Sequence, residues 1–197
     1  MQQHSETCNI HAYVKTDLDS YITSRFPKNS PVRLAVIPFT VPANFTGYGA
    51  GRKNLGTELA AAMQRRILEK ELVPIAEVFN REYWPGKEGE FFSGNFGALA
   101  QAREAGYDLV LVGLVDNLSS LNAITVYTKI IDVDAGVTLW YGKATAQASI
   151  TENYDRRSRN PLKYIVNVRT RPDLLYFSDI IDEVVNCSTD EIASIED

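Results

Sequence analysis

Histidine is almost absent from this chain, and the motifs that usually accompany catalysis are missing. The two histidines, His4 and His11, both lie within the first 11 residues, a polar segment that we expect to be a tail. The folded body therefore lacks the side chain that most often serves as a general base. A Gly-x-Ser-x-Gly nucleophile elbow is missing as well. These absences exclude most designs for nucleophilic catalysis.

Four aspartates do occur at the ends of expected strands, where active sites of α/β proteins often lie. They are Asp108, Asp116, Asp132 and Asp134. No spacing among them pairs two carboxylates for acid–base work, and turns favour aspartate for their own reasons. We therefore predict a protein that is not an enzyme and uses no cofactor.

Long apolar runs and an export signal are missing too. No stretch approaches the roughly 20 apolar residues that a helix needs to span a bilayer. The first residues lack the basic region followed by an apolar one that marks a signal peptide. Otherwise the 197 residues, 45% hydrophobic and 23% charged, suit one globular domain with a sizeable core. The net charge of −5 argues against a protein that coats nucleic acid.

Cysteine is limited to Cys8 and Cys187, near opposite ends of the chain. An even count permits one disulfide between the two ends, two unrelated thiols are the alternative, and the sequence leaves both open. Cys8 also lies between His4 and His11 in a pattern of metal-ligand types. A structural zinc site needs four ligands with recognisable spacings, so a flexible tail is favoured over a metal site.

The stretch 32–39, Val-Arg-Leu-Ala-Val-Ile-Pro-Phe, gives the strongest strand signal. A short apolar run bounded by prolines is typical of a strand buried on both faces of a helix-covered sheet. Pro38 cannot donate to a sheet ladder and is expected where the chain leaves the sheet. We predict that this strand is the central rib of a small sheet.

The whole pattern predicts an α/β (α+β) fold, with a small mixed sheet of about four to five strands, helices packed on it, and helices flanking it at both ends. Helices are expected at 12–26, 53–69, 95–105 and 172–195, and further strands at 72–79, 107–115, 123–132 and 137–146. Pro74 moves its strand toward an edge of the sheet, and Gly106 is placed to cap a helix. The expected division is a tail and short helix at 1–31, a core at 32–150, and a basic loop and packed helix at 151–197.

The pair of strands around residue 135 has further signals. Asp-Ala-Gly at 134–136 predicts a hairpin turn between two strand-like runs. Within the first run, Thr125, Tyr127 and Lys129 alternate with Ile124, Val126, Thr128 and Ile130. That alternation predicts one covered face and one wetter face.

Two loops invite a binding role. The glycines of 47–56 (Gly47, Gly49, Gly51 and Gly56) follow a strand and precede a helix, but match neither phosphate-binding fingerprint. A surface loop is therefore favoured over a nucleotide site. The segment 83–94 carries four aromatic residues: Tyr83, Trp84, Phe91 and Phe92. These rings either cap the core locally or form a contact surface for a partner, and both readings stay open.

The stretch 156–171 has a formal charge of +6, which leaves −11 for the rest of the chain because the whole carries −5. Its basic residues are Arg156, Arg157, Arg159, Lys163, Arg169 and Arg171. Such a patch could meet lipid headgroups, nucleic acid or an acidic partner. A solvated loop that pairs with the acidic body is favoured.

Three stretches together resemble a group of bacterial envelope proteins: the strand 33–39, the helix-glycine-aspartate-strand segment 100–113, and the hairpin within 124–140. The group comprises the curli-secretion lipoprotein, the lipoprotein activators of penicillin-binding proteins, the flagellar outer-membrane lipoproteins and the amino-terminal domain of TolB. The likeness covers roughly residues 32–150 and rests on structural motifs. It implies a periplasm-facing protein, commonly anchored to the outer membrane by a lipidated cysteine, that binds other proteins without catalysis of its own.

The leading hypothesis is therefore a non-catalytic, periplasm-facing lipoprotein domain that binds a protein partner in envelope assembly or secretion. No lipidation motif is present, so its anchor is expected to precede Met1 in the native precursor. A periplasm would suit a Cys8–Cys187 disulfide. The alternatives are a small-ligand or nucleotide module that uses 47–56, and a lipid- or nucleic-acid-binding module that uses 156–171. A homo-oligomer is left open.

Overall fold

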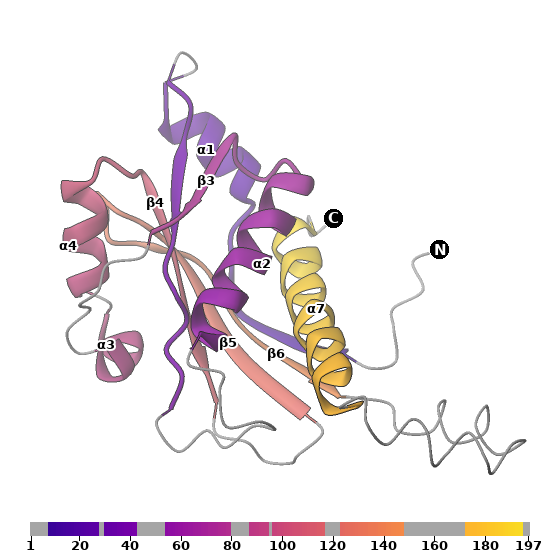
Figure 1. Ribbon diagram of the computed structural model, residues 1–197. Coiled ribbons are helices and arrows are strands. Elements are labelled where there is room, and N and C mark those ends of the chain that lie inside the picture. Colours follow the sequence, from indigo (N-terminus) through magenta and orange to yellow (C-terminus); the bar gives the residue numbers. More distant parts are fainter. Residues whose placement is uncertain are drawn as a thin grey trace, which may run out of the picture.

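The computed structural model describes residues 8–27, 30–42, 54–79, 87–94, 96–116, 123–147 and 172–194. Within them six strands form one mixed sheet, in the order β1-β6-β5-β4-β2-β3 (Figure 1). The strands are β1 (Cys8–Lys15), β2 (Arg33–Val36), β3 (Ile75–Val78), β4 (Leu109–Val115), β5 (Ala123–Asp132) and β6 (Thr138–Gln147). The helices are α1 (Leu18–Arg25), α2 (Leu55–Glu69), α3 (Lys87–Ser93), α4 (Phe96–Glu104) and α7 (Pro172–Ala193). None of these helices is long and apolar enough to cross a membrane.

The mixed α/β class, with helices on both faces of the sheet, is confirmed. β2 runs parallel to β3 and β4, while β4, β5, β6 and β1 are antiparallel to their neighbours. β3 lies at an edge, as Pro74 predicts. Gly106 follows α4 with a φ of 75° and Gly136 closes the β5–β6 turn with a φ of 66°. Both angles lie in the left-handed region that glycine tolerates best.

Two expectations about the sheet are wrong. In the described part of the chain it has six strands instead of four to five, and β2 lies second from an edge, with β3 outside it, so β2 is not the central rib. The central pair is β5 and β4, and β4 is buried along its whole length. The apolar run of β2 predicts that the strand is buried on both faces. A strand buried in this way need not lie at the centre of the sheet.

The expectation for residues 1–26 is wrong in part. Residues 8–15, assigned by sequence to a tail and the start of a helix, form edge strand β1, and only Leu18–Arg25 is helical. β1 pairs antiparallel with β6, from Cys8 opposite Ala146 to Lys15 opposite Trp140. Residues 9–12 alternate between exposed and half-buried, as a strand does. The pairing partner lies more than 120 residues away in sequence, and a local pattern cannot reveal it.

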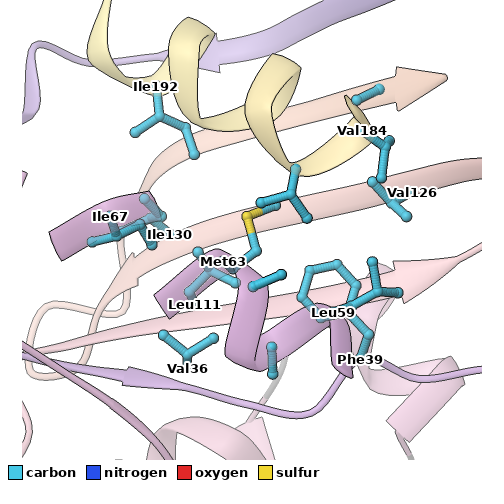
Figure 2. Close-up of a cluster of buried hydrophobic side chains, with 14 of the residues drawn as sticks. Val36, Phe39, Leu59, Met63, Ile67, Leu111, Val126, Ile130, Val184 and Ile192 are labelled. Carbon is cyan, nitrogen blue, oxygen red and sulfur yellow. The ribbon is translucent and has the colours of Figure 1, made fainter. Parts of the chain in front are cut away.

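One face of the sheet, here named the closed face, is covered by α2 and α7, which lie side by side on it (Figure 1). Every third or fourth residue of α2 is buried there, including Leu59, Met63 and Ile67. Side chains from α7, such as Val184 and Ile192, complete the cluster over the strands (Figure 2). Each fully buried aliphatic side chain contributes about 1.5–3 kcal/mol to the stability of the fold. This cluster is the main core.

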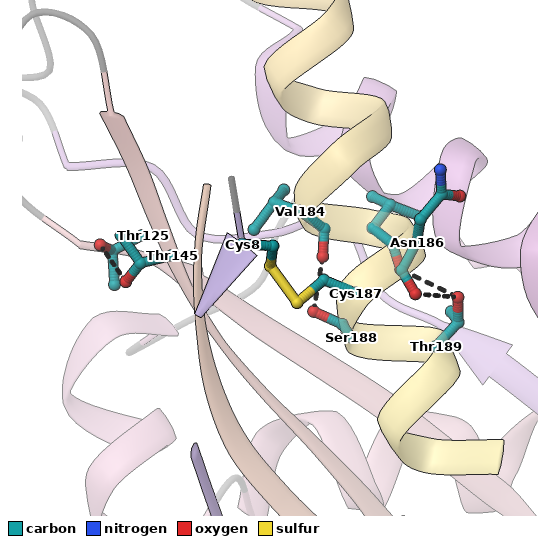
Figure 3. The surroundings of a disulfide bond; sticks show 9 residues. Cys8, Thr125, Thr145, Val184, Asn186, Cys187, Ser188 and Thr189 are labelled. Atoms are coloured by element: carbon teal, nitrogen blue, oxygen red, sulfur yellow. Dashed lines mark hydrogen bonds between the residues drawn. A yellow bond between two sulfur atoms is a disulfide. The ribbon is translucent and has the colours of Figure 1, made fainter. Parts of the chain in front are cut away.

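A disulfide fastens the edge of the sheet to the closed face (Figure 3). Cys8 of β1 and Cys187 of α7 are joined with an S–S distance of 2.03 Å and a Cα–Cα distance of 6.4 Å, across 179 residues of sequence. The bonded Cys8 sulfur is not a thiolate ligand, so the His4–Cys8–His11 pattern does not supply a metal site through it. Within the described ranges no group of three or more His, Cys, Asp or Glu side chains could hold a metal ion.

The other face, here named the open face, carries α3 and α4, which pack against β4. A second and smaller buried cluster lies there, with Phe91 from α3, Ala98, Leu99 and Ala102 from α4, and Val110, Val112 and Leu114 from β4 among its members. In Figure 1 these helices lie across the sheet from α2 and α7. Toward β5, β6 and β1 the open face carries half-buried and exposed side chains.

Candidate protein-binding surface

Five side chains from three neighbouring strands share the open face. They are Tyr13 of β1, Tyr127 and Lys129 of β5, and Tyr141 and Lys143 of β6, and we name them the tyrosine–lysine surface. The register places the four side chains of β5 and β6 together, because directly paired residues of a sheet point to the same side. Alternate residues of the same strands, such as Val126 and Trp140, point into the core of the closed face.

Tyrosine and lysine alternate in both directions across β5 and β6. Tyr127 is paired with Lys143, and Lys129 is paired with Tyr141. The Lys143 Nζ lies 5.4 Å from the centre of the Tyr127 ring, and the Lys129 Nζ lies 4.9 Å from that of Tyr141. Both distances lie within the range of attraction between a cation and an aromatic ring. The square of four side chains is therefore held in shape by its own contacts.

The surface continues onto β1 through a bulge. The pairing of β1 with β6 shifts between Ala12 and Val14, so Tyr13 has no partner of its own in the ladder. Its ring stacks on Tyr141 instead, with centroids 4.7 Å apart and planes 30° apart. Tyr13 keeps 49% of its surface exposed. Bulges often re-aim a side chain in this way.

Helix α3 carries two adjacent phenylalanines, of which Phe91 is buried and Phe92 is exposed. Phe91 is 1% exposed, packs near Tyr127 and Tyr141, and its carbonyl accepts a hydrogen bond from Lys129 Nζ. Phe92 is 63% exposed, with its ring centre 6.3 Å from that of Tyr127.

Of the two readings of the aromatic segment 83–94, the structure confirms the core cap for Phe91, and the partner contact stays a prediction for the exposed Phe92. Phe91 caps the smaller core, and Phe92 extends the tyrosine–lysine surface. The segment is helical from residue 87, and Tyr83 and Trp84 lie outside the described residues.

Burial tunes the ionisable groups of the surface. Partial burial lowers the pKa of Lys129, because a charged ammonium is less well solvated there. Burial raises the pKa of Tyr141, with added repulsion from Tyr13 and Tyr127 if those ionise. Neither Lys129 nor Lys143 forms an ion pair with a carboxylate of the described ranges.

The strand-end aspartates have structural partners. Asp132 is fully buried, accepts hydrogen bonds from Tyr21 Oη at 3.0 Å and the Ala135 amide at 2.6 Å, and lies 3.5 Å from Arg25 Nε. It thereby ties α1 to the β5–β6 turn. Asp108 accepts from the Arg33 amide at 2.8 Å and so holds β2 beside β4. These contacts explain the positions of Asp108 and Asp132 by a structural role, with no need for a catalytic one.

The other candidate sites of the sequence are placed only in part. Gly56 packs so closely that a Cβ there would lie 2.1 Å from the Phe39 carbonyl oxygen, which gives this glycine a packing role. Gly47, Gly49 and Gly51 lie outside the described residues, and so do all six basic residues of 156–171. A nucleotide, lipid or nucleic-acid site in those segments stays a prediction.

Sequence reasoning found Phe92 but did not select the tyrosine–lysine surface. The signal that could have found it is the alternation of Thr125, Tyr127 and Lys129, whose prediction of a wetter face is confirmed. The same alternation occurs in β6 with Tyr141 and Lys143. No comparable signal pointed to Tyr13, and the sequence pattern placed its segment in a helix.

Comparisons with known proteins show weak likeness. No family model matches the chain, and no curated protein matches it by sequence. Among solved structures, the PelC dodecamer from Paraburkholderia phytofirmans has a TM-score of 0.45 and 12% identity, covering 90% of this chain and 96% of that one. Lipoprotein GNA1162 from Neisseria meningitidis has a TM-score of 0.35 and 18% identity, covering 71% and 100%. The LpoB C-terminal domain from Escherichia coli has a TM-score of 0.33 and 15% identity, covering 65% and 91%. Likenesses at this level transfer neither an activity nor an assembly state to this chain.

Proposed function

We propose that this protein is a non-catalytic domain of the bacterial envelope that binds a protein partner through the tyrosine–lysine surface and Phe92. The observation that carries the proposal is the exposure of aromatic rings on one sheet face: Phe92 at 63% and Tyr13 at 49%, beside two half-buried tyrosines. Tyrosine and phenylalanine are enriched where proteins bind one another. Exposed rings gathered on one face of a sheet are more informative than apolar residues scattered singly.

Two further observations support the envelope as the compartment. The Cys8–Cys187 disulfide suits an oxidising compartment such as the periplasm, where disulfides form and persist. The stretches 33–39, 100–113 and 124–140 resemble periplasm-facing lipoproteins, which supports a lipid-anchored precursor as part of the proposal. The hydrogen bonds by which Asp108 and Asp132 hold neighbouring elements together support a binding role in preference to a catalytic one.

Site-specific photocross-linking in the native cell tests the proposal. The variants Phe92→p-benzoyl-phenylalanine and Tyr13→p-benzoyl-phenylalanine place the reactive group on the surface. Leu68→p-benzoyl-phenylalanine is the control, because Leu68 is 39% exposed on α2, across the sheet. We expect one envelope protein, identified by mass spectrometry, to be linked from positions 92 and 13 but not from 68. Equal linking from all three positions, or none from 92 and 13, would overturn the proposal.

A further inference from the structure

The charge of the open face differs in sign from that of the chain. The whole chain carries −5. The outward-facing residues of β1, β6 and β5 include two lysines and no carboxylate; they are Asn9, His11, Tyr13, Val14, Thr125, Tyr127, Lys129, Tyr141, Lys143 and Thr145. In an acidic protein, a face of three strands without a carboxylate is a local positive surface.

The two lysines of this face are also partnered differently from cations elsewhere. Lys15 pairs with Glu191 at 3.2 Å on the closed side, and Arg33 pairs with Glu77 at 2.9 Å. Lys129 is held instead by aromatic rings and the Phe91 carbonyl, and Lys143 by the Tyr127 ring. An ammonium group has three donors, so both lysines keep donors available for an anion.

The spacing of the lysines suits an extended chain. Lys129 and Lys143 are diagonal neighbours across β5 and β6, a relation that places two residues about 7–8 Å apart. In an extended segment, residues i and i+2 point to the same side and lie about 6.6 Å apart. Two carboxylates at i and i+2 of one strand-like segment would therefore reach both lysines, while its backbone passes over the tyrosine rings.

We infer that the protein's partner presents an extended acidic segment, with carboxylates on alternate residues, to Lys129 and Lys143. This inference rests on the proposed function and adds the chemistry of the partner to it. The carboxylates would accept charge-assisted hydrogen bonds from the two ammonium groups. Tyr13 and Phe92 would contact the residues that flank the acidic pair.

Binding of synthetic peptides to the purified full chain tests the inference. The probe is a labelled 12-residue peptide of alternating glutamate and threonine, followed by fluorescence anisotropy at low salt. Peptides with glutamine in place of glutamate, and with six glutamates in one block before six threonines, are the matched controls. We expect the alternating peptide to bind more tightly than both, with an affinity that falls as salt is added.

Variants assign the binding to the surface. Lys143→Gln should weaken binding of the alternating peptide about tenfold, the effect of one lost charge-assisted hydrogen bond, while Lys143→Arg should retain it. Arg65→Gln removes the same charge from an exposed position on α2 and should leave binding unchanged. Thermal unfolding of each variant shows that the fold is kept.

Three results would overturn the inference: no binding of the alternating peptide, equal binding of the block peptide, or an equal loss in Arg65→Gln. Binding to phosphatidylglycerol vesicles that is lost in Lys143→Gln, without peptide binding, would assign the face to a lipid surface and also overturn it. A protein cross-linked from positions 13 and 92 together with a negative peptide result would reject the acidic segment alone. A negative cross-linking result would reject the proposed function itself.

Discussion

The two faces of the sheet are built from the same strands but carry different side chains, apolar on one face and partly polar on the other. On the closed face, α2 and α7 cover apolar residues in one continuous cluster. On the open face, α3 and α4 cover the part around β4, and the part over β5, β6 and β1 carries tyrosine and lysine. The larger buried cluster lies on the closed face. The open face instead leaves the aromatic side chains of Tyr13 and Phe92 exposed.

Strand β6 shows the contrast within three residues. Trp140 points into the closed face and is 2% exposed, whereas Tyr141 points to the open face and is half-buried. The Trp140 ring lies over Gly142, where an added Cβ would come within 2.5 Å of the ring. A strand of alternating residues thus packs one set of side chains in the core and leaves the other set on the open face.

Replacing one large aromatic on each face should give the largest difference. Trp140→Ala should lower the free energy of unfolding by about 3–5 kcal/mol, because it leaves a cavity in the core. Phe92→Ala, at a 63% exposed position, should change it by less than about 0.5 kcal/mol. Urea denaturation followed by circular dichroism measures both. Similar losses in the two variants would show that Phe92 also contributes to the core.

Removing the disulfide should have the next largest effect. Cys8→Ser with Cys187→Ser should lower the free energy of unfolding by about 2–4 kcal/mol, because the bond closes a long loop in the unfolded chain. Hydrogen exchange should show the loss of protection first in β1 and least in β4. Ser188→Ala is a control on the same turn of α7, where the Ser188 hydroxyl donates to the Val184 carbonyl at 2.8 Å. Uniform loss of protection across the sheet would contradict a local role for the bond.

The pH dependence of stability should show a smaller effect that belongs to the open face. Burial lowers the pKa of Lys129 below its ordinary 10.5 in the folded state. Between the lowered pKa and the ordinary one, the unfolded chain binds more protons than the folded chain, so the free energy of unfolding rises with pH. We expect this rise in the wild type as pH approaches the ordinary lysine pKa of 10.5 from below.

Lys129→Met should lack that rise, and Lys143→Met, which leaves Lys129 in place, should keep it. Urea midpoints at a series of pH values measure all three proteins. A rise of the same size in Lys129→Met would show that another group causes it.

Local patterns predicted most elements of the fold, because their signals lie within single segments. The 3.6-residue repeat of α2, the buried run of β4 and the turn glycine of the β5–β6 hairpin were all legible in sequence. Strand β1 was not, because its alternation spans few residues and its partner β6 is distant along the chain. The count of strands was wrong for the same reason.

The candidate site was predictable only in fragments. Phe92 and the wetter side of β5 had signals, but nothing local relates β5 to β1 or to α3. Neighbouring residues Phe91 and Phe92 look alike in sequence, and only the packing of α3 on β4 buries one and exposes the other.

The sequence by itself determined the class of the fold, the burial of β2 and β4 and the scarcity of catalytic side chains, since these follow from composition and short-range periodicity. The tertiary structure alone decided that Cys8 meets Cys187, that residues 8–15 complete the sheet, and that three tyrosines and two lysines share one face. The physical reason is that strand pairing and helix packing join residues far apart in the chain. Their free energy depends on contacts that no single segment contains.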